Sequence, residues 1–174
     1  MSALAKISEP VADQEDAEIS FEAERRIVRL NNRYAQCLDA KRLDAWVGFF
    51  AEDGIYRIYP REILEAGLPA CLLYLDGRKM MRDRVLCLRE IILYADNAAR
   101  HFVGAPAIRE EEGKVYAVTT NVIVVHSDVE GHSQIFCAGE YRDRIVERNG
   151  RLLFLEKTVV VDTFTVPSHL SHPV

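Results

Sequence analysis

The sequence predicts an α+β fold, in which helices near the N-terminus pack on a long, mostly antiparallel sheet. Apolar residues recur at helical spacing in the first fifty residues, and the period changes from 3.6 to 2 at residue 55. The strands predicted in the second half each run for about 12 to 15 residues, more than is usual. Strands of that length must twist and coil. Helices laid over the concave side would therefore produce a cone with a pocket or a filled interior.

The first predicted helix covers residues 20 to 40. Ser20 is suited to cap its N-terminus, and Glu22 and Glu24 lie in the first turn, where the helix dipole favours negative charge. The residues at helical spacing form one stripe: Ile27, Leu30, Asn31, Tyr34 and Leu38.

The next elements follow in chain order: a short helix over 43–50, a strand over 55–59, a loop or short helix over 61–69, a short strand over 70–75 and a third helix after residue 77. Pro60 closes the first strand, which is rich in residues that favour β-structure. The third helix has one apolar face, formed by Met81, Val85, Leu88 and Ile92.

Three or four long strands are predicted, at about 98–110, 114–127, 133–147 and 151–166. Gly113 and Gly131 mark the first two turns, and Asn149–Gly150 is the strongest short hairpin signal. No linker divides the chain. We therefore expect three parts: a flexible acidic segment over 1–18, one domain over 19–166 and a solvated tail over 167–174.

Composition excludes several classes of function. The 174 residues carry a formal charge of −5 and no basic cluster, which argues against nucleic acid as a partner. No window is apolar for the 18 or more residues that a membrane span needs. The first residues lack the apolar core of a secretory signal. We expect a cytoplasmic protein.

The sequence also lacks the usual ligand patterns. A Rieske cluster needs a His two or three residues after a Cys, and none of the four cysteines is followed in that way. The pair His169 and His172 lies in the predicted tail, and no Gly-rich phosphate loop occurs. We expect no cofactor and no metal in this chain.

One acid–base pair is possible. Asp39 ends the first predicted helix and His101 lies on a predicted strand, so the two can meet inside a cone, with Tyr34, Tyr56 and Asn121 lining the same space. An Asp beside a His fixes the imidazole tautomer and raises its basicity, which makes a proton-abstracting dyad. The same pair can equally be structural, because buried polar groups need hydrogen-bond partners. The structural interpretation is favoured.

Charged features of the sheet and the third helix predict an interface between subunits. Tyr141 and Asp143 share one face of a strand, and Arg82 and Arg84 lie on the third helix. Asp162 interrupts a run of valines, where a carboxylate is costly unless it is paired. Arg82, Arg84 or an arginine of a neighbouring subunit is the expected partner of Asp162.

An ordered series of motifs resembles a known family. Residues 34–60 contain Leu-Asp, a Trp, Phe-Ala-x-Asp and Tyr-x-x-x-Pro. The later motifs follow in order: Met81-Arg82-Asp83-Arg84-Val85, Ala99-Arg100-His101, Gly139 with Tyr141 and Asp143, and Val161-Asp162. Together they resemble the small (β) subunit of aromatic-ring-hydroxylating dioxygenases over about residues 20–165.

The resemblance implies an NTF2-like, cystatin-like cone and a non-catalytic, structural role. The partner α subunit would carry a 2Fe–2S Rieske cluster and a mononuclear Fe(II), with electrons from NAD(P)H through a reductase. The β subunits would form a trimer within an α3β3 assembly that acts on a benzoate-, salicylate- or terephthalate-type aromatic acid. Residues 61–73 and 93–98 depart from the family pattern, which leaves the substrate open.

Stand-alone dehydratases and isomerases of the same superfamily are the alternative. They place a catalytic Asp at the end of the first helix and a His on a strand, and Asp39, His101 and Tyr34 match those places. The resemblance of the third helix and of Val161-Asp162 favours the oxygenase subunit.

Overall fold

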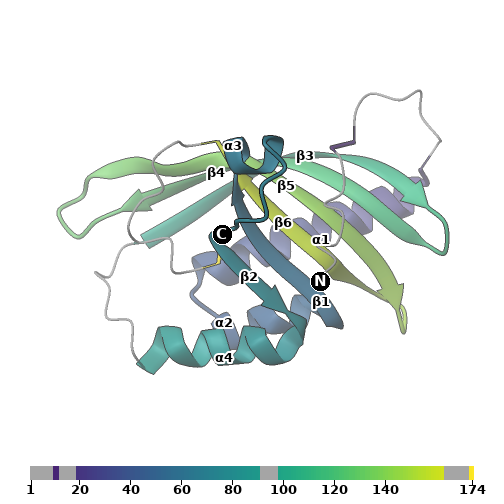
Figure 1. Ribbon diagram of the computed structural model, residues 1–174, viewed down its shortest axis with the longest axis horizontal. Coiled ribbons are helices and arrows are strands. Elements are labelled where there is room, and N and C mark those ends of the chain that lie inside the picture. Colours follow the sequence, from purple (N-terminus) through teal and green to yellow (C-terminus); the bar gives the residue numbers. More distant parts are fainter. Residues whose placement is uncertain (1–9, 12–18, 91–97, 163–172) are drawn as a thin grey trace.

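The computed structural model describes residues 10–11, 19–90, 98–162 and 173–174. The helical elements are α1 (Phe21–Asp39), α2 (Leu43–Trp46), the 3-10 helix η1 (Val47–Phe49), α3 (Arg61–Glu65) and α4 (Gly77–Glu90). The strands are β1 (Phe50–Pro60), β2 (Leu73–Asp76), β3 (Ala98–Glu111), β4 (Val115–Ser127), β5 (Ser133–Arg148) and β6 (Arg151–Val161). The predicted α+β class is confirmed (Figure 1).

The six strands form one sheet in the order β2-β1-β6-β5-β4-β3. The neighbours are antiparallel except for β1 and β6, which are parallel. Helix α1 lies across one face of this curved sheet, and α4 lies beside β1 and β2 (Figure 1). We call the face that α1 covers the inward face. None of the helices in the described ranges is long and apolar enough to cross a membrane.

Ser20 caps α1 as predicted. Its φ and ψ of −61° and 137° are extended, and its Oγ accepts a hydrogen bond from the main-chain N of Ala23 at 3.2 Å. The predicted stripe is buried at every position: Ile27, Leu30, Asn31, Tyr34 and Leu38. Asn31 Nδ2 also donates to Thr120 Oγ1 on the inward face of β4 at 3.2 Å. The helix is therefore fixed on the sheet by apolar contact and by one buried hydrogen bond.

The predicted hairpins are present. Asn149 and Gly150 have φ values of 52° and 73°, as a two-residue type I′ turn requires, and they join β5 to β6. Gly113 and Lys114 also have positive φ values, 76° and 60°, between β3 and β4. Local turn chemistry thus determines the order of the meander.

Two predicted boundaries were wrong. β1 begins at Phe50 instead of residue 55, and β2 covers residues 73–76 instead of 70–75. Phe50 pairs with Phe154, and the register then shifts before Ile55 pairs with Glu156. This irregular stretch lacks the alternation of period 2 that marks a strand in sequence.

Several predictions concern residues outside the described ranges. They include most of the acidic segment 1–18 and of the tail 167–174, Ile92 of the third helix, and the last strand beyond residue 162. The tail was expected to be solvated, but its last two residues, Pro173 and Val174, are buried. The expectation was wrong there because Val174 packs in the core between α1 and the sheet.

Aromatic rings fill much of the interior. Tyr34 and Phe154 lie edge to face with ring centroids 5.4 Å apart, and Trp46 and Tyr56 do so at 5.3 Å. All four side chains are fully buried. Such pairs add about 0.5–1.5 kcal/mol each beyond the burial of their area, so the inside of the cone is a packed core that surrounds a few polar groups.

Candidate functional site

Asp39 and His101 meet inside the cone, as predicted. Asp39 is the last residue of α1, and its Oδ1 lies 2.7 Å from His101 Nδ1 on β3. The same oxygen accepts the main-chain N–H of His101 at 3.1 Å. Arg100 Nη1 lies 3.7 Å from the other carboxylate oxygen. The His101 side chain is only 2% exposed, so its position and its tautomer are fixed by the pair.

Burial keeps His101 neutral. It lowers the pKa of His101, and this effect exceeds the opposing effects of the hydrogen bond and the charge of Asp39, while Lys157 lowers the pKa further. In the neutral ring Nδ1 carries the proton toward Asp39. Nε2 then offers a lone pair, and it has no hydrogen-bond partner among the described residues. The pair therefore has the arrangement of a weak base beside its orienting carboxylate.

Neutral His101 should make stability depend on pH. The pKa of His101 is lower in the folded than in the unfolded protein. The contribution of His101 to the free energy of unfolding is therefore full above about pH 6.5 and is lost as the pH falls toward the folded pKa. The loss is about 1.4 kcal/mol for each unit by which folding lowers the pKa. Urea unfolding of wild type and His101→Gln between about pH 7.5 and about pH 5.5 measures it. The wild type should lose more stability than the variant, and parallel profiles would contradict the assignment.

Three buried tyrosines lie in the same interior. Tyr34 and Tyr56 lie inside as expected, and Tyr141 joins them, each with at most 1% of its surface exposed. Burial raises the pKa of all three phenols, so they stay neutral. Asn121 was expected in the same space but is exposed, because it pairs with Glu140 on the opposite face of the sheet.

A buried ion pair that the sequence analysis missed lies beside the tyrosines. Lys157 Nζ is 2.9 Å from Asp143 Oδ2, and both side chains are fully buried. The ammonium also lies 3.6 Å from the centre of the Tyr141 ring and 4.5 Å from those of Tyr34 and Phe154. Burial raises the pKa of Asp143 to about 6 although Lys157 opposes the rise, and burial lowers the pKa of Lys157. The sequence did hold one indication that Lys157 points inward, because it alternates in phase with two buried valines, Val159 and Val161.

This geometry corrects two interface candidates. Tyr141 and Asp143 share a face, as predicted, but each is 1% exposed and the face is the inward one. They contact groups of their own chain and cannot face a neighbouring subunit. Alternation shows which residues share a face of a strand, but it does not show which face the helices cover.

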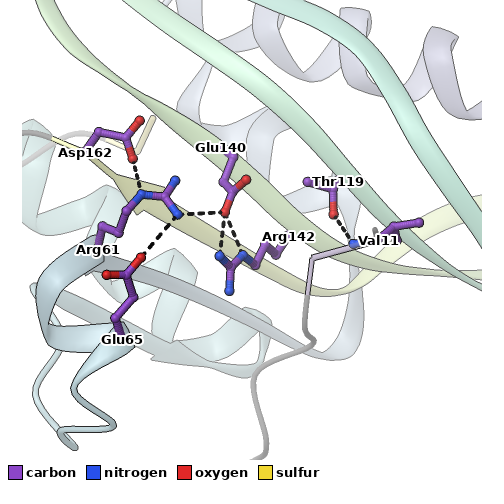
Figure 2. Close-up of polar contacts among 7 residues, drawn as sticks. All are labelled: Val11, Arg61, Glu65, Thr119, Glu140, Arg142 and Asp162. Carbon is purple, nitrogen blue, oxygen red and sulfur yellow. Dashed lines mark hydrogen bonds and ion pairs between the residues drawn. The ribbon is translucent and has the colours of Figure 1, made fainter. Parts of the chain in front are cut away.

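Asp162 has a different partner from those expected. Arg61 Nε lies 2.6 Å from Asp162 Oδ1, and Arg61 Nη1 lies 3.3 Å from Glu140 Oε1. The parallel register pairs Pro60 with Val161 and so brings the next two residues together. Figure 2 shows Arg61 between the two carboxylates. Arg142 Nη2 pairs with the same oxygen of Glu140, Oε1, at 2.6 Å.

The remaining interface candidates lie on α4. Arg82 is exposed and Arg84 is partly buried, so Arg82 and Asp162 are the candidates most open to solvent. The outer ion-pair network joins Asp162, Arg61, Glu65, Glu140 and Arg142. A separate hydrogen bond runs from the main-chain N of Val11 to Thr119 Oγ1 at 2.9 Å (Figure 2). The outer face of the sheet is therefore charged, whereas the inward face is mostly apolar.

A groove of about 490 Å³ lies outside the cone, between α1 and the turn that joins β5 to β6. Five arginines line it, namely Arg26, Arg29, Arg33, Arg42 and Arg151. None of the predicted site residues lines this groove. Within the described ranges no group of three His, Cys, Asp or Glu side chains is placed to hold a metal ion.

Comparison with known proteins places this geometry in a family. The SnoaL-like domain matches residues 20–158. The small subunit of anthranilate 1,2-dioxygenase from Burkholderia cepacia is 34% identical over 160 residues, which cover 92% of this chain and 97% of that protein. The β 1 subunit of the terminal oxygenase component of terephthalate 1,2-dioxygenase from Comamonas sp. is 28% identical over 85% of this chain and 96% of that protein.

A solved structure agrees. A protein of Novosphingobium aromaticivorans, assigned as the β subunit of an aromatic-ring-hydroxylating dioxygenase, superposes with a TM-score of 0.82 at 30% identity. The match covers 90% of this chain and all of that one. The expected NTF2-like cone is thereby confirmed. The chain belongs to the SnoaL-like domain family and, within it, to the small (β) subunits of aromatic-ring-hydroxylating dioxygenases.

Proposed function

We propose that this chain is the non-catalytic, structural β subunit of the terminal oxygenase of a Rieske-type ring-hydroxylating dioxygenase. The observation that carries the proposal is the likeness to the anthranilate dioxygenase small subunit, which extends over 97% of that protein. Anthranilate and terephthalate, named for the relatives, are both aromatic carboxylates. The substrate class proposed is therefore an aromatic acid, of the benzoate, salicylate or terephthalate type.

In this proposal the two kinds of subunit have different roles. The Rieske cluster and the mononuclear Fe(II) belong to the α subunit, and electrons reach them from NAD(P)H through a reductase. The β subunit supplies a rigid scaffold for a cytoplasmic α3β3 assembly. Its interior supports this role, because a packed aromatic core surrounds the Lys157–Asp143 pair and leaves these groups inaccessible from the surface.

The contacts between subunits are proposed to involve α4 and the outer ion-pair network. Arg82 on α4 is exposed, Arg84 lies two residues further along, and Asp162 is 47% exposed at the side chain. An ion pair that is half exposed in the monomer gains strength when a neighbour excludes water from it. Asp162 is proposed to act in this way within a trimer of β subunits.

Expression with and without a Rieske-type α subunit tests the proposal. Alone, the protein should be an iron-free trimer that does not act on aromatic acids; with the α subunit, an assembly that hydroxylates them should form. Arg82→Glu should shift the trimer toward monomer in sedimentation, whereas Arg25→Glu, an exposed change on α1, should not. A monomeric wild type, or turnover by the chain alone, would refute the proposal.

The alternative, a stand-alone dehydratase or isomerase, is supported by one observation. Asp39 and His101 are 2.7 Å apart, and the second ring nitrogen of His101 has no partner in the described part of the chain. Under this alternative the isolated protein has activity, which His101→Gln abolishes without unfolding it. Under the β-subunit proposal His101→Gln leaves the oxygenase activity per assembled complex unchanged.

A further inference from the structure

The arginine groove outside the cone gathers positive charge on a chain whose formal charge is −5. Its five arginines come from α1, from the connection to α2 and from the first residue of β6. Glu147 pairs with Arg26 at 2.9 Å, but the described residues that line the groove include no aspartate or glutamate. Arg26, Arg29 and Arg33 follow one another on α1 at spacings of three and four residues, at which like charges repel. The groove therefore favours an acidic occupant.

Apolar side chains lie among the arginines of the groove. Phe49, Leu152 and Leu153 line it and are partly buried. The guanidinium carbon of Arg33 lies 5.9 Å from the centre of the Phe49 ring. The volume of about 490 Å³ is within the range of pockets that hold a drug-sized body. The occupant that fits this lining is therefore compact, with an apolar side chain next to acidic groups.

The turn between β4 and β5 has this composition. We call residues 128–131 the β4–β5 tip. Val129 is 81% exposed, the largest fraction among the large apolar side chains of the described ranges, and it lies between Asp128 and Glu130. The main-chain N of Asp128 donates to the main-chain oxygen of His132 at 3.0 Å, and the main-chain N of His132 donates to Asp128 Oδ1 at 2.8 Å. The tip is thus held in one conformation, which lowers the entropic cost of docking it.

The tip and the groove lie at opposite ends of β5. The tip precedes Ser133, where β5 begins, and the groove includes Gly150 and Arg151, which follow its last residue. The strand has 16 residues, and at about 3.3 Å for each residue its ends are about 50 Å apart. Figure 1 shows the two turns at opposite ends of the sheet. A tip therefore cannot reach the groove of its own chain, but it can reach the groove of another copy.

We propose that the β4–β5 tip of one copy docks in the arginine groove of the next, with Val129 against the apolar lining and the carboxylates of Asp128 and Glu130 against the arginines. The contact is head-to-tail, and such contacts form a closed ring when the rotation between copies fits. It rests on the trimer of the proposed function and identifies two surfaces that meet in it.

Charge-reversal variants of the full chain provide the test. Arg33→Glu in the groove and Glu130→Arg at the tip should each raise the dissociation constant of the trimer at least about tenfold in sedimentation equilibrium, because each brings like charges together. Both substitutions in one chain should recover most of the loss. A mixture of the two single variants should sediment faster than either alone, because each variant supplies the charge that the other has lost.

Arg25→Glu on α1 and Glu112→Arg before the turn between β3 and β4 are the matched controls. They make the same changes of charge at exposed positions that do not line the groove or the tip, and they should leave the trimer unchanged. All four positions are exposed, so the variants should fold.

The outcomes separate this contact from the trimer itself. A wild type that is monomeric would refute the trimer and the contact together. A trimer that Arg82→Glu dissociates, but that Arg33→Glu and Glu130→Arg leave intact, would refute the contact alone. Dissociation by both single variants without recovery in the double variant or the mixture would show that the tip and the groove do not meet. If Arg33→Glu prevents only the binding of the α subunit, the groove belongs to that partner and the proposal is overturned.

Discussion

Replacing Lys157 by methionine is expected to destabilise the protein by about 3–5 kcal/mol. The substitution leaves the Asp143 carboxylate fully buried without the ammonium group that lies 2.9 Å away. Removing one partner of a buried pair is costly, because the remaining charge has lost its access to water and gains nothing in return. The ammonium also contacts three aromatic rings, whose cation–π contribution disappears with it. Urea unfolding at neutral pH measures the loss.

The pH dependence of that loss has a definite sign. The pKa of Asp143 is about 6 in the folded protein and about 3.9 in the unfolded chain. A carboxyl group with a raised folded pKa loses stabilisation as the pH rises between these two values. Without Lys157 the folded pKa rises further, so the decline continues above pH 6. The destabilisation by Lys157→Met should therefore be larger at about pH 8 than at about pH 5.

The double variant Lys157→Met with Asp143→Leu is the matched control. It removes both charges at once and should recover most of the stability lost in the single variant. A single variant that loses less than about 1 kcal/mol, or a double variant that is no more stable than the single one, would contradict the assignment of a buried ion pair.

The substitution Gly139→Ala is expected to have the second large effect. A Cβ at this position would lie 2.0 Å from the main-chain oxygen of Val160 and 3.1 Å from Val161 Cα. The obstacle is backbone, so it cannot move aside as a side chain would. Gly139 pairs with Val161, and β5 and β6 must therefore separate locally. The expected loss is about 3 kcal/mol or more, at the upper end for overpacked sites.

Gly48→Ala tests whether the Gly139 effect is steric. Among the described residues, no atom beyond the adjacent residues and the local helix backbone lies within 4 Å of a Cβ built at Gly48. The change should leave stability within about 0.5 kcal/mol or raise it slightly, because alanine has less conformational freedom in the unfolded chain. Thermal unfolding of both variants compares them directly. Similar Tm values for the two would show that the predicted close contact at Gly139 is absent.

Local patterns were sufficient to predict most of the fold. The Ser20 cap, the buried stripe of α1 and the Asn149–Gly150 turn each depend on neighbours in sequence, and all three are present. The parallel pairing of β1 with β6 joins residues about a hundred positions apart, and no local pattern encodes it. The contact between Arg61 and Asp162 depends on that register, which is why other partners were expected for Asp162.

The candidate site was predictable only where it depends on local sequence patterns. Asp39 ends a helix and His101 has inward parity on a strand, so their meeting follows from two local facts and the curvature of the sheet. The inward position of Asp143 depends on which face α1 covers. The place of Lys157 opposite Asp143 depends on strand register. Both are properties of packing, and the sequence pattern left them open.

The parallel pair also affects how the protein is made. β1 takes its place in the sheet only beside β6, which ends at Val161, so about a hundred residues must leave the ribosome between the two. Until then β1 and β2 form at most an isolated two-strand ribbon, which is marginally stable in water. Their apolar side chains therefore stay accessible until β6 has emerged, and we expect residues 50–76 to be exposed to aggregation during synthesis.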